Sequence, residues 1–172
     1  MASAPGRCGL LGNPSDIYGG AVLACSLEER ATCRLIPTET DYPPEDPRLW
    51  EAARAVAPEG RWRVEWRSEI PRSSGLAGST ALLAATLACL RGEPPGDRTA
   101  FADEVRAVER DRAGIACGYQ DAFMVVHGGL RLMEFTGRDP DRASVPVRTT
   151  EIEADLPFLL ISTGVERLSG GV

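Results

Sequence analysis

Pro71-Arg72-Ser73-Ser74-Gly75-Leu76-Ala77-Gly78-Ser79-Thr80-Ala81 is the stretch of this 172-residue sequence that decides the fold. It follows the period-two pattern of Arg61–Ile70, which predicts a half-buried strand, and leads into the Ala- and Leu-rich run Leu76–Leu90, which predicts a buried helix. Free amides at the start of a helix attract anions, and small residues let the backbone approach them closely. We therefore expect residues 71–81 to cradle phosphate groups.

Two hydroxyl groups of this loop bear on its chemistry. The Ser79 and Thr80 hydroxyls lie at the expected helix start, where they suit a phosphate oxygen or a magnesium ion. The alternative is structural: Gly75 and Gly78 make a tight turn, and Ser79 caps the helix. A Walker-type loop is excluded, as is Schiff-base chemistry, because all nineteen basic residues are arginine and none is lysine.

The loop resembles the second motif of the GHMP kinases (galactokinase, homoserine kinase, mevalonate kinase, phosphomevalonate kinase), which has the form PxxxGLxxSxA. The match rests on Pro71, Gly75, Leu76, Ser79 and Ala81. In that family the motif wraps the nucleotide phosphates. The resemblance implies that the ATP contacts here are Pro71, Ser73, Ser74, Gly75, Leu76, Ala77, Gly78, Ser79 and Thr80.

The opening segment Ala4–Gly20 reads APGRCGLLGNPSDIYGG and resembles the first GHMP motif, APGRxxLxGEHxDYxGG, which lines the substrate pocket. The resemblance implies that Arg7 lies beside the reacting hydroxyl, where a guanidinium can stabilise developing negative charge. Alternatively, Arg7 is a surface charge next to an ordinary turn. The acceptor-side residues that the resemblance implies are Asn13, Ser15, Asp16 and Tyr18.

One departure from the motif bears on the substrate. Asn13-Pro14-Ser15 stands where many members have Glu-His, and GLLGNPSDIYGG is similar to the glucuronokinase branch. This likeness implies phosphorylation of the anomeric hydroxyl of glucuronic acid or a related sugar.

Two carboxylates complete the expected site. The segment Gly114–Asp121 resembles the family's GIxxGxxD, and Val125–Phe135 resembles its VxxGGLxxMDF continuation with Glu134 in place of Asp. The resemblance implies that Asp121 is the base that takes the acceptor's proton. It also places Glu109 near the family's magnesium-binding glutamate, so that Ser79 and Glu109 would hold Mg²⁺. A helix cap for Asp121 and a solvated helix face for Glu109 are the alternatives.

The remaining pattern predicts further strands and helices. Apolar runs Ala21–Leu27 and Ala31–Thr38, joined by Glu28-Glu29-Arg30, predict a hairpin. The pattern predicts helices over Leu49–Ala57, from Phe101 to about Arg110, and over Tyr119–His127, with strands at Leu130–Phe135, Phe158–Ser162 and near Val147. These elements predict an α+β domain, and the resemblance implies the ribosomal-protein-like β-α-β type, a mixed sheet with helices packed on it.

Composition limits the class of protein. A 43% hydrophobic content suits one domain, and a net charge of −6 argues against nucleic-acid binding. No long apolar run or secretory signal is evident, so we expect no membrane segment and a cytoplasmic location.

The cysteines, the histidine and the tryptophans are interpreted as structural. The five cysteines form no CxxC pair and are expected to be reduced, with a Cys25–Cys33 disulfide across the predicted hairpin as a minor alternative. We interpret His127 as structural, and Trp62 and Trp66 as core residues rather than a platform for sugar stacking.

The resemblance covers nearly the whole chain but only the front half of the family's architecture. We therefore expect residues 1–172 to be an N-terminal ATP-binding domain without the second domain, which a partner chain or a missing C-terminal part would supply. The expected activity is transfer of the ATP γ-phosphoryl group to a sugar hydroxyl, with ATP and Mg²⁺ as cofactors. The alternatives are a GHMP kinase for a galactose- or fucose-type sugar or a mevalonate-type alcohol, and a non-catalytic fragment that binds nucleotide or sugar.

Overall fold

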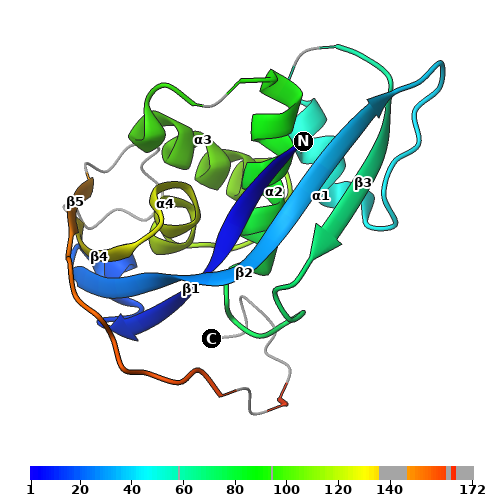
Figure 1. Ribbon diagram of the computed structural model, residues 1–172. Coiled ribbons are helices and arrows are strands. Elements are labelled where there is room, and N and C mark those ends of the chain that lie inside the picture. The colour runs from blue at the N-terminus through cyan, green and yellow to red at the C-terminus, as the bar shows by residue number, and fades with distance from the viewer. Residues whose placement is uncertain (58, 94, 136–146, 162–163, 166–172) are drawn as a thin grey trace.

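The computed structural model describes residues 1–57, 59–93, 95–135, 147–161 and 164–165 (Figure 1). This part of the chain contains both strands and helices. In order, they are β1 (Ala2–Leu11), the short 3-10 helix η1 (Ser15–Tyr18), β2 (Ala21–Pro37), α1 (Pro47–Arg54), β3 (Trp62–Ser68), α2 (Gly78–Arg91), α3 (Arg98–Asp111), α4 (Gln120–His127), β4 (Leu130–Phe135) and β5 (Val147–Glu151).

The sheet is organised around β2, the long strand that crosses it in Figure 1. One edge of β2 pairs with β1, over residues 23–26 and 30–33. The other edge pairs first with β4, over residues 21–25, and then with β3, over residues 31–37. The strand β5 extends the sheet beyond β4. These ladders are antiparallel, and an isolated bridge between Tyr42 and Arg63 is parallel.

The predicted hairpin over residues 21–38 is wrong, because the segment forms one continuous strand. Glu28, Glu29 and Arg30 are exposed and lie where the second edge of β2 passes from β4 to β3. Their polarity reflects this uncovered stretch of the strand. They include no Gly, Pro or Asn, the residues that make a chain reversal inexpensive. The Arg30 guanidinium instead donates from Nε to Ser3 Oγ at 3.0 Å, which ties β2 to β1.

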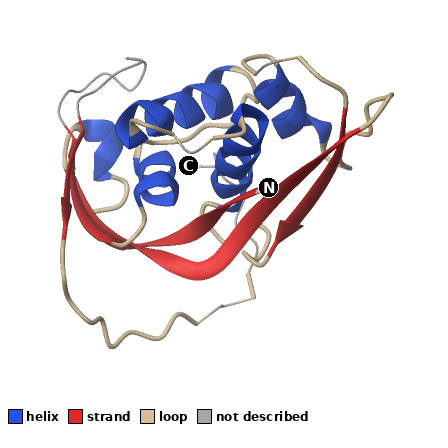
Figure 2. Ribbon diagram, turned by 45° about the horizontal axis from the view of Figure 1, so that its top comes forward, coloured by secondary structure: helices blue, strands red, loops and turns tan. Residues whose placement is uncertain are grey.

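The helices α1 to α4 gather on one face of the sheet, as Figure 2 shows. The helix α2 is central and is buried over most of its length, which agrees with its Ala- and Leu-rich composition. It packs against β1 and β2 below it and against α1, α3 and α4 beside it. Asp46 and Asp97 cap the starts of α1 and α3 through backbone amides. One cluster of core residues therefore lies around α2, and a second lies between α4 and the strands β2 and β4.

Most of the predicted elements are confirmed, and the α+β class with them. The helix starts and ends differ from the expected ones by a few residues, and the short strand near Val147 is present as β5. The predicted strand at Phe158–Ser162 is wrong for Phe158–Ile161, where the chain is irregular. These four residues are exposed, and no strand of the described region pairs with them, so their backbone lacks the ladder that a strand requires. Ser162 lies outside the described residues, as does the stretch 166–172.

The structure also locates the cysteines, the two predicted core tryptophans and the histidine. Cys25 and Cys33 lie on the same strand, so they do not face each other across a hairpin, and all five cysteines are free. Trp62 and Trp66 pack against the core, as expected. His127 stacks on Phe123, with ring centroids 5.9 Å apart. No helix in the described ranges is long and apolar enough to cross a membrane.

Replacing Leu83 on α2 by alanine is expected to lower the free energy of unfolding by about 2–5 kcal/mol, because its fully buried side chain would leave a cavity. Urea unfolding followed by circular dichroism measures the change. Its neighbour Leu82 is only partly buried and provides the matched control, since Leu82→Ala should be clearly milder. Equal losses in the two variants would contradict the placement of α2.

Candidate functional site

Arg7 joins the three segments in which the sequence placed the site. Its guanidinium donates from Nε and Nη2 to Asp121 Oδ1, at 2.8 and 2.5 Å, and from Nη1 to the Gly75 carbonyl oxygen at 3.0 Å. Arg7 belongs to β1, Gly75 to the loop before α2, and Asp121 to the first turn of α4. The Arg7 side chain is 9% exposed and the Asp121 side chain 23%. One ion pair therefore connects a strand, a loop and a helix.

The backbone of β1 lies directly against the same loop. The Arg7 amide donates to the Leu76 carbonyl oxygen at 3.1 Å. A Cβ atom at Gly6 would lie 3.1 Å from that oxygen and 3.2 Å from Ile70 Cγ1, which is closer than ordinary van der Waals contact. The glycine that precedes Arg7 in the first motif thus permits the close approach that brings Arg7 to the loop.

The loop itself has an unusual backbone. Ser73, Gly75 and Ala77 have positive φ angles of 53°, 74° and 59°, so every second residue is left-handed. Alternation of this kind turns successive amide groups toward one side and forms a concavity suited to anions. The two residues other than glycine each cost about 1–2 kcal/mol in this conformation. Such strain is concentrated at functional sites. The loop leads directly into α2, whose amino-terminal end adds a positive partial charge.

Glu109, on α3, is held by the hydroxyl groups at the start of α2. Ser79 Oγ donates to Glu109 Oε1 at 2.8 Å, and Thr80 Oγ1 donates to Glu109 Oε2 at 2.7 Å. Glu109 is only 1% exposed, and this burial raises the pKa of its carboxyl group. The charge of Asp121 raises the pKa further, whereas the two hydroxyl groups lower it. The alternative of a solvated helix face for Glu109 is therefore wrong.

These oxygens fit a magnesium ion by their chemistry. Mg²⁺ prefers oxygen ligands, and it binds through one or two protein groups together with substrate phosphates. The Ser79 hydroxyl is exposed at the loop, and the Glu109 carboxylate lies directly behind it. A buried carboxylate with a raised pKa also gains from a nearby cation, because the cation favours its ionised form. The hydroxyl of Thr80, which was expected to contact the nucleotide, is turned toward Glu109 instead.

The predicted acceptor-side residues lie on the loop between β1 and β2, and their roles differ. Asp16 is buried, and its Oδ2 accepts from the amides of Tyr119, at 2.9 Å, and Gln120, at 3.3 Å, at the start of α4. Ser15 Oγ donates to the Ala21 carbonyl oxygen at 2.7 Å. Both side chains therefore hold structure around the site. Asn13 and Tyr18 are exposed.

Sequence reasoning missed two side chains in the site. Gln120 Nε2 donates to Asn13 Oδ1 at 2.7 Å, and Gln120 Oε1 is buried without a hydrogen-bond partner among the described residues. Gln120 directly precedes Asp121, which was the available signal. Cys117 lies close to Glu109 and Asp121, and burial, followed by the Glu109 charge, raises the pKa of its thiol to about 12. This thiol therefore remains protonated.

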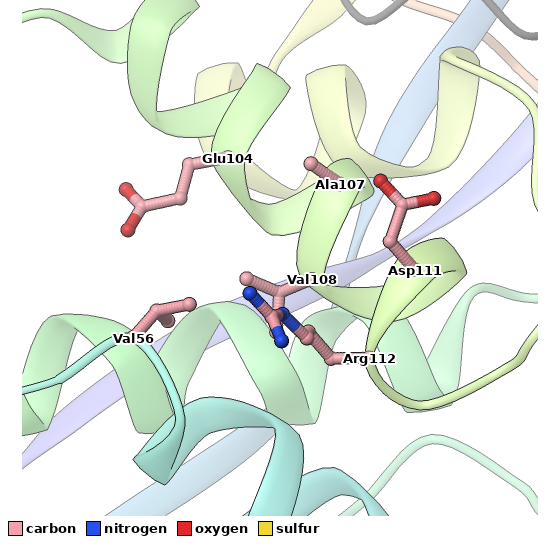
Figure 3. Close-up of a pocket in the computed structure, with 6 residues that line it drawn as sticks. All are labelled: Val56, Glu104, Ala107, Val108, Asp111 and Arg112. Carbon is pink, nitrogen blue, oxygen red and sulfur yellow. The ribbon is translucent and has the colours of Figure 1, made fainter.

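The surface hollows in the described region lie away from these residues. One, of about 330 Å³, lies between the end of α1 and α3 (Figure 3). It is lined by Val56, Glu104, Ala107, Val108, Asp111 and Arg112. A second, of about 450 Å³, lies at the carboxyl-terminal end of α4 and includes His127. Burial lowers the pKa of this histidine, which favours its neutral form.

Comparison with known proteins places this geometry in context. Residues 48–129 match the family model of the GHMP kinases N terminal domain. The mevalonate kinase of Archaeoglobus fulgidus is 32% identical over 182 residues, covering 95% of this chain and 58% of that protein. Residues 48–129 are thus similar to the GHMP kinases N terminal domain, and nearly the whole chain is similar to part of that mevalonate kinase.

Solved structures share the fold. The D-glycero-D-manno-heptose 1-phosphate kinase from Bacteroides thetaiotaomicron aligns with a TM-score of 0.73 at 22% identity, over 90% of this chain and 60% of its own. The Streptococcus pneumoniae phosphomevalonate kinase in complex with phosphomevalonate and AMPPNP aligns with a TM-score of 0.66 at 13% identity, over 87% and 57%. The fold is therefore that of GHMP kinase N-terminal domains, and the chain spans about three fifths of these relatives' length.

The pKa of Glu109 predicts how stability depends on pH. In the unfolded chain Glu109 ionises near its ordinary pKa of 4.5, whereas the folded protein keeps the proton to higher pH. Its contribution to the free energy of unfolding therefore falls as pH rises from about 4.5 through the raised pKa. Glu109→Gln removes this penalty, so the variant should gain stability relative to the wild type across that range. Urea unfolding at several pH values measures the difference.

The exposed Glu93 provides the matched control for that measurement. The difference between the wild type and Glu93→Gln should not vary with pH in this way. A constant difference between the wild type and Glu109→Gln at every pH would show that burial of Glu109 does not raise its pKa.

Proposed function

We propose that this chain belongs to the GHMP kinases, binds ATP and transfers its γ-phosphoryl group to a hydroxyl of a small molecule, a proposal supported by the match of residues 48–129 and by the shared fold. In this proposal residues 1–172 supply the N-terminal ATP-binding domain. The observation that carries it is the arrangement around the loop 71–81. On one side Arg7 and Asp121 form an ion pair, and on the other Glu109 accepts from the hydroxyls of Ser79 and Thr80.

The loop is proposed to bind the nucleotide phosphates. Its alternating left-handed residues and the start of α2 together present backbone amides and a positive partial charge. The phosphomevalonate kinase structure with AMPPNP shows that a protein of this fold binds a nucleotide. Magnesium, when bound, would be held by Ser79 Oγ and Glu109 and would neutralise phosphate charge.

Asp121 is proposed as the base. Its Oδ1 is occupied by Arg7, whereas Oδ2 has no hydrogen bond from any residue that the structure describes. The free oxygen lies on a partly exposed carboxylate in the first turn of α4, where it can accept the proton of an acceptor hydroxyl. As the hydroxyl oxygen attacks, the Arg7 guanidinium can stabilise negative charge on the transferred group. Phosphoryl transfer depends mainly on such positioning and charge stabilisation.

The acceptor is proposed to be a sugar that reacts at its anomeric hydroxyl, with glucuronic acid or a related uronic acid as the first candidate. This finer assignment rests on Asn13-Pro14-Ser15-Asp16 in the first motif. With Ser15 and Asp16 engaged in structural hydrogen bonds, Asn13 and Tyr18 are the exposed side chains of this loop that can meet the acceptor. Reaction of a sugar is also consistent with the shared fold of the heptose 1-phosphate kinase.

A mevalonate-type alcohol is the second candidate. The 32% identity to the mevalonate kinase of Archaeoglobus fulgidus, over 95% of this chain, favours it. Acceptor-dependent ADP release, measured with purified protein, ATP and Mg²⁺ against glucuronate, galactose, fucose and mevalonate, distinguishes the two. Turnover of mevalonate without turnover of glucuronate would overturn the sugar assignment. Nucleotide binding with no acceptor-dependent release would indicate a non-catalytic binding fragment.

Asp121→Asn is expected to lower kcat by about 10²–10⁴-fold, because the amide cannot accept the proton. The variant should still bind ATP, since Asp121 does not belong to the phosphate loop. Steady-state ADP release measures the first effect, and the rise in Tm on adding AMPPNP and Mg²⁺ measures the second.

The exposed Asp155 provides the matched control, and Asp155→Asn should leave kcat unchanged. An unchanged kcat in Asp121→Asn, with normal folding by circular dichroism, would exclude Asp121 as the base.

A further inference from the structure

Two cysteines face each other across the first pair of strands. In the antiparallel ladder of β1 and β2, Cys8 lies directly opposite Cys25, between the pairs Arg7–Ser26 and Gly9–Ala24. Directly opposed residues in such a ladder have Cα atoms about 4.5 or 5.5 Å apart. A disulfide needs a Cα separation of about 4.4–6.8 Å. The register thus places both cysteines within bridging distance without any separation of the strands.

Both thiols also lie on the face of the sheet away from the helices. Ala24 is fully buried in the core on the helix-covered side, so the next residue, Cys25, points to the opposite face. Cys8 shares that face because directly paired residues point the same way. Each is only partly buried, so a small oxidant can reach it. Burial, followed by the charge of a Cys8 thiolate, raises the pKa of the Cys25 thiol, which shows that the two groups interact.

Cys33 and Cys117 are in less reactive surroundings. Cys33 is fully buried, and burial, followed by the charge of Cys89, raises the pKa of its thiol to about 12. Burial also raises the pKa of the Cys117 thiol to about 12. Reaction with an oxidant proceeds through the thiolate, which these two groups do not form at neutral pH. Cys8 and Cys25 therefore make up the accessible dithiol of the described region.

We propose that Cys8 and Cys25 form a reversible disulfide when the protein meets a small disulfide oxidant such as oxidised glutathione. One thiolate attacks a glutathione sulfur, forms a mixed disulfide and expels one glutathione thiolate. The second thiolate then attacks the protein sulfur of that mixed disulfide, forms the Cys8–Cys25 bond and expels the second glutathione. The protein loses two electrons and two protons, and the oxidant is reduced to two thiols.

The bond would restrain the acceptor-side loop. It encloses residues 9–24, which contain Asn13, the helix η1 and the capping carboxylate of Asp16. Cβ atoms of opposed residues lie about 4.5–5.5 Å apart, whereas a disulfide draws them to about 3.8 Å. Bond formation therefore pulls β1 toward β2 at the residue next to Arg7.

Mass spectrometry tests the bond directly. Trypsin cleaves after Arg7 and Arg30, so both cysteines fall in one peptide, residues 8–30, which contains no other cysteine. After treatment with oxidised glutathione and alkylation with N-ethylmaleimide, this peptide should lack both adducts and be lighter by two hydrogen atoms. Dithiothreitol should restore the two adducts. A peptide that keeps both adducts after oxidation, or that carries only glutathione, would overturn the proposal.

Variants separate the pair from the other cysteines. Cys25→Ser should abolish the change, whereas Cys89→Ser, at a partly buried cysteine of α2, is the matched control and should preserve it. The oxidised wild type should show a Tm a few degrees above that of the reduced protein, because the bond restrains the unfolded chain. An unchanged Tm with the bond formed would show that the loop is not restrained.

An effect of the disulfide on the acceptor KM rests on the proposed function, so it is measured separately from formation of the bond. Oxidation should change the KM for the acceptor by at least a few-fold more than the KM for ATP, because the enclosed loop lies on the acceptor side. Failure of the kinase assay in reduced protein would remove the proposed function but leave the mass result intact. A bond that forms in an active enzyme without any change in acceptor KM would overturn the proposed link between the bond and the acceptor loop.

Discussion

The structure of the site depends on the contacts of one nearly buried guanidinium. Arg7 is 8% exposed, and a charge removed from water in this way is tolerated only when it is paired and hydrogen-bonded. Its partners are the Asp121 carboxylate on α4 and the Gly75 carbonyl on the loop. These groups are remote in sequence, so the requirement to satisfy Arg7 fixes the positions of β1, the loop and α4 relative to one another. Gly6 and the Leu76 carbonyl make that approach sterically possible.

Around this ion pair the protein retains features that do not favour stability. Ser73 and Ala77 have left-handed backbones, and Glu109 is buried with a raised pKa. The two left-handed residues each cost about 1–2 kcal/mol, and burial of the Glu109 carboxylate also opposes folding. Departures from the rules of a well-packed fold are expected where a site must bind a ligand. Here they lie in the loop before α2 and where Glu109 contacts the start of α2. These are the proposed sites for the nucleotide phosphates and for magnesium.

Sequence reasoning could predict the parts of the fold that depend on local pattern. The apolar composition of α2 and the alternation around Trp62 and Trp66 are sufficient to predict a buried helix and a strand, because burial on one face sets those periods. The continuity of β2 depends on which strands cover its second edge, a tertiary property that no local pattern contains. The resemblance implied roles for Arg7 and Asp121 at the acceptor hydroxyl, whereas their direct ion pair depends on the packing of α4 against β1. The burial of Glu109 was not foreseen, because it depends on the packing of α3 on α2.

Asp16 shows how the acceptor side and the base are linked. The sequence suggested a ligand for sugar hydroxyls, but its carboxylate accepts from the amides that open α4. An acidic group at this end of a helix is favourable, since the backbone dipoles leave a positive partial charge there. Asp121 lies in the first turn of α4, so two carboxylates are near the start of this helix. Arg7 offsets the charge of Asp121. A movement of the loop between β1 and β2 would thus shift the start of α4, and with it Asp121. In the proposed function, the hydrogen bonds of Asp16 would therefore link acceptor binding to the position of Asp121.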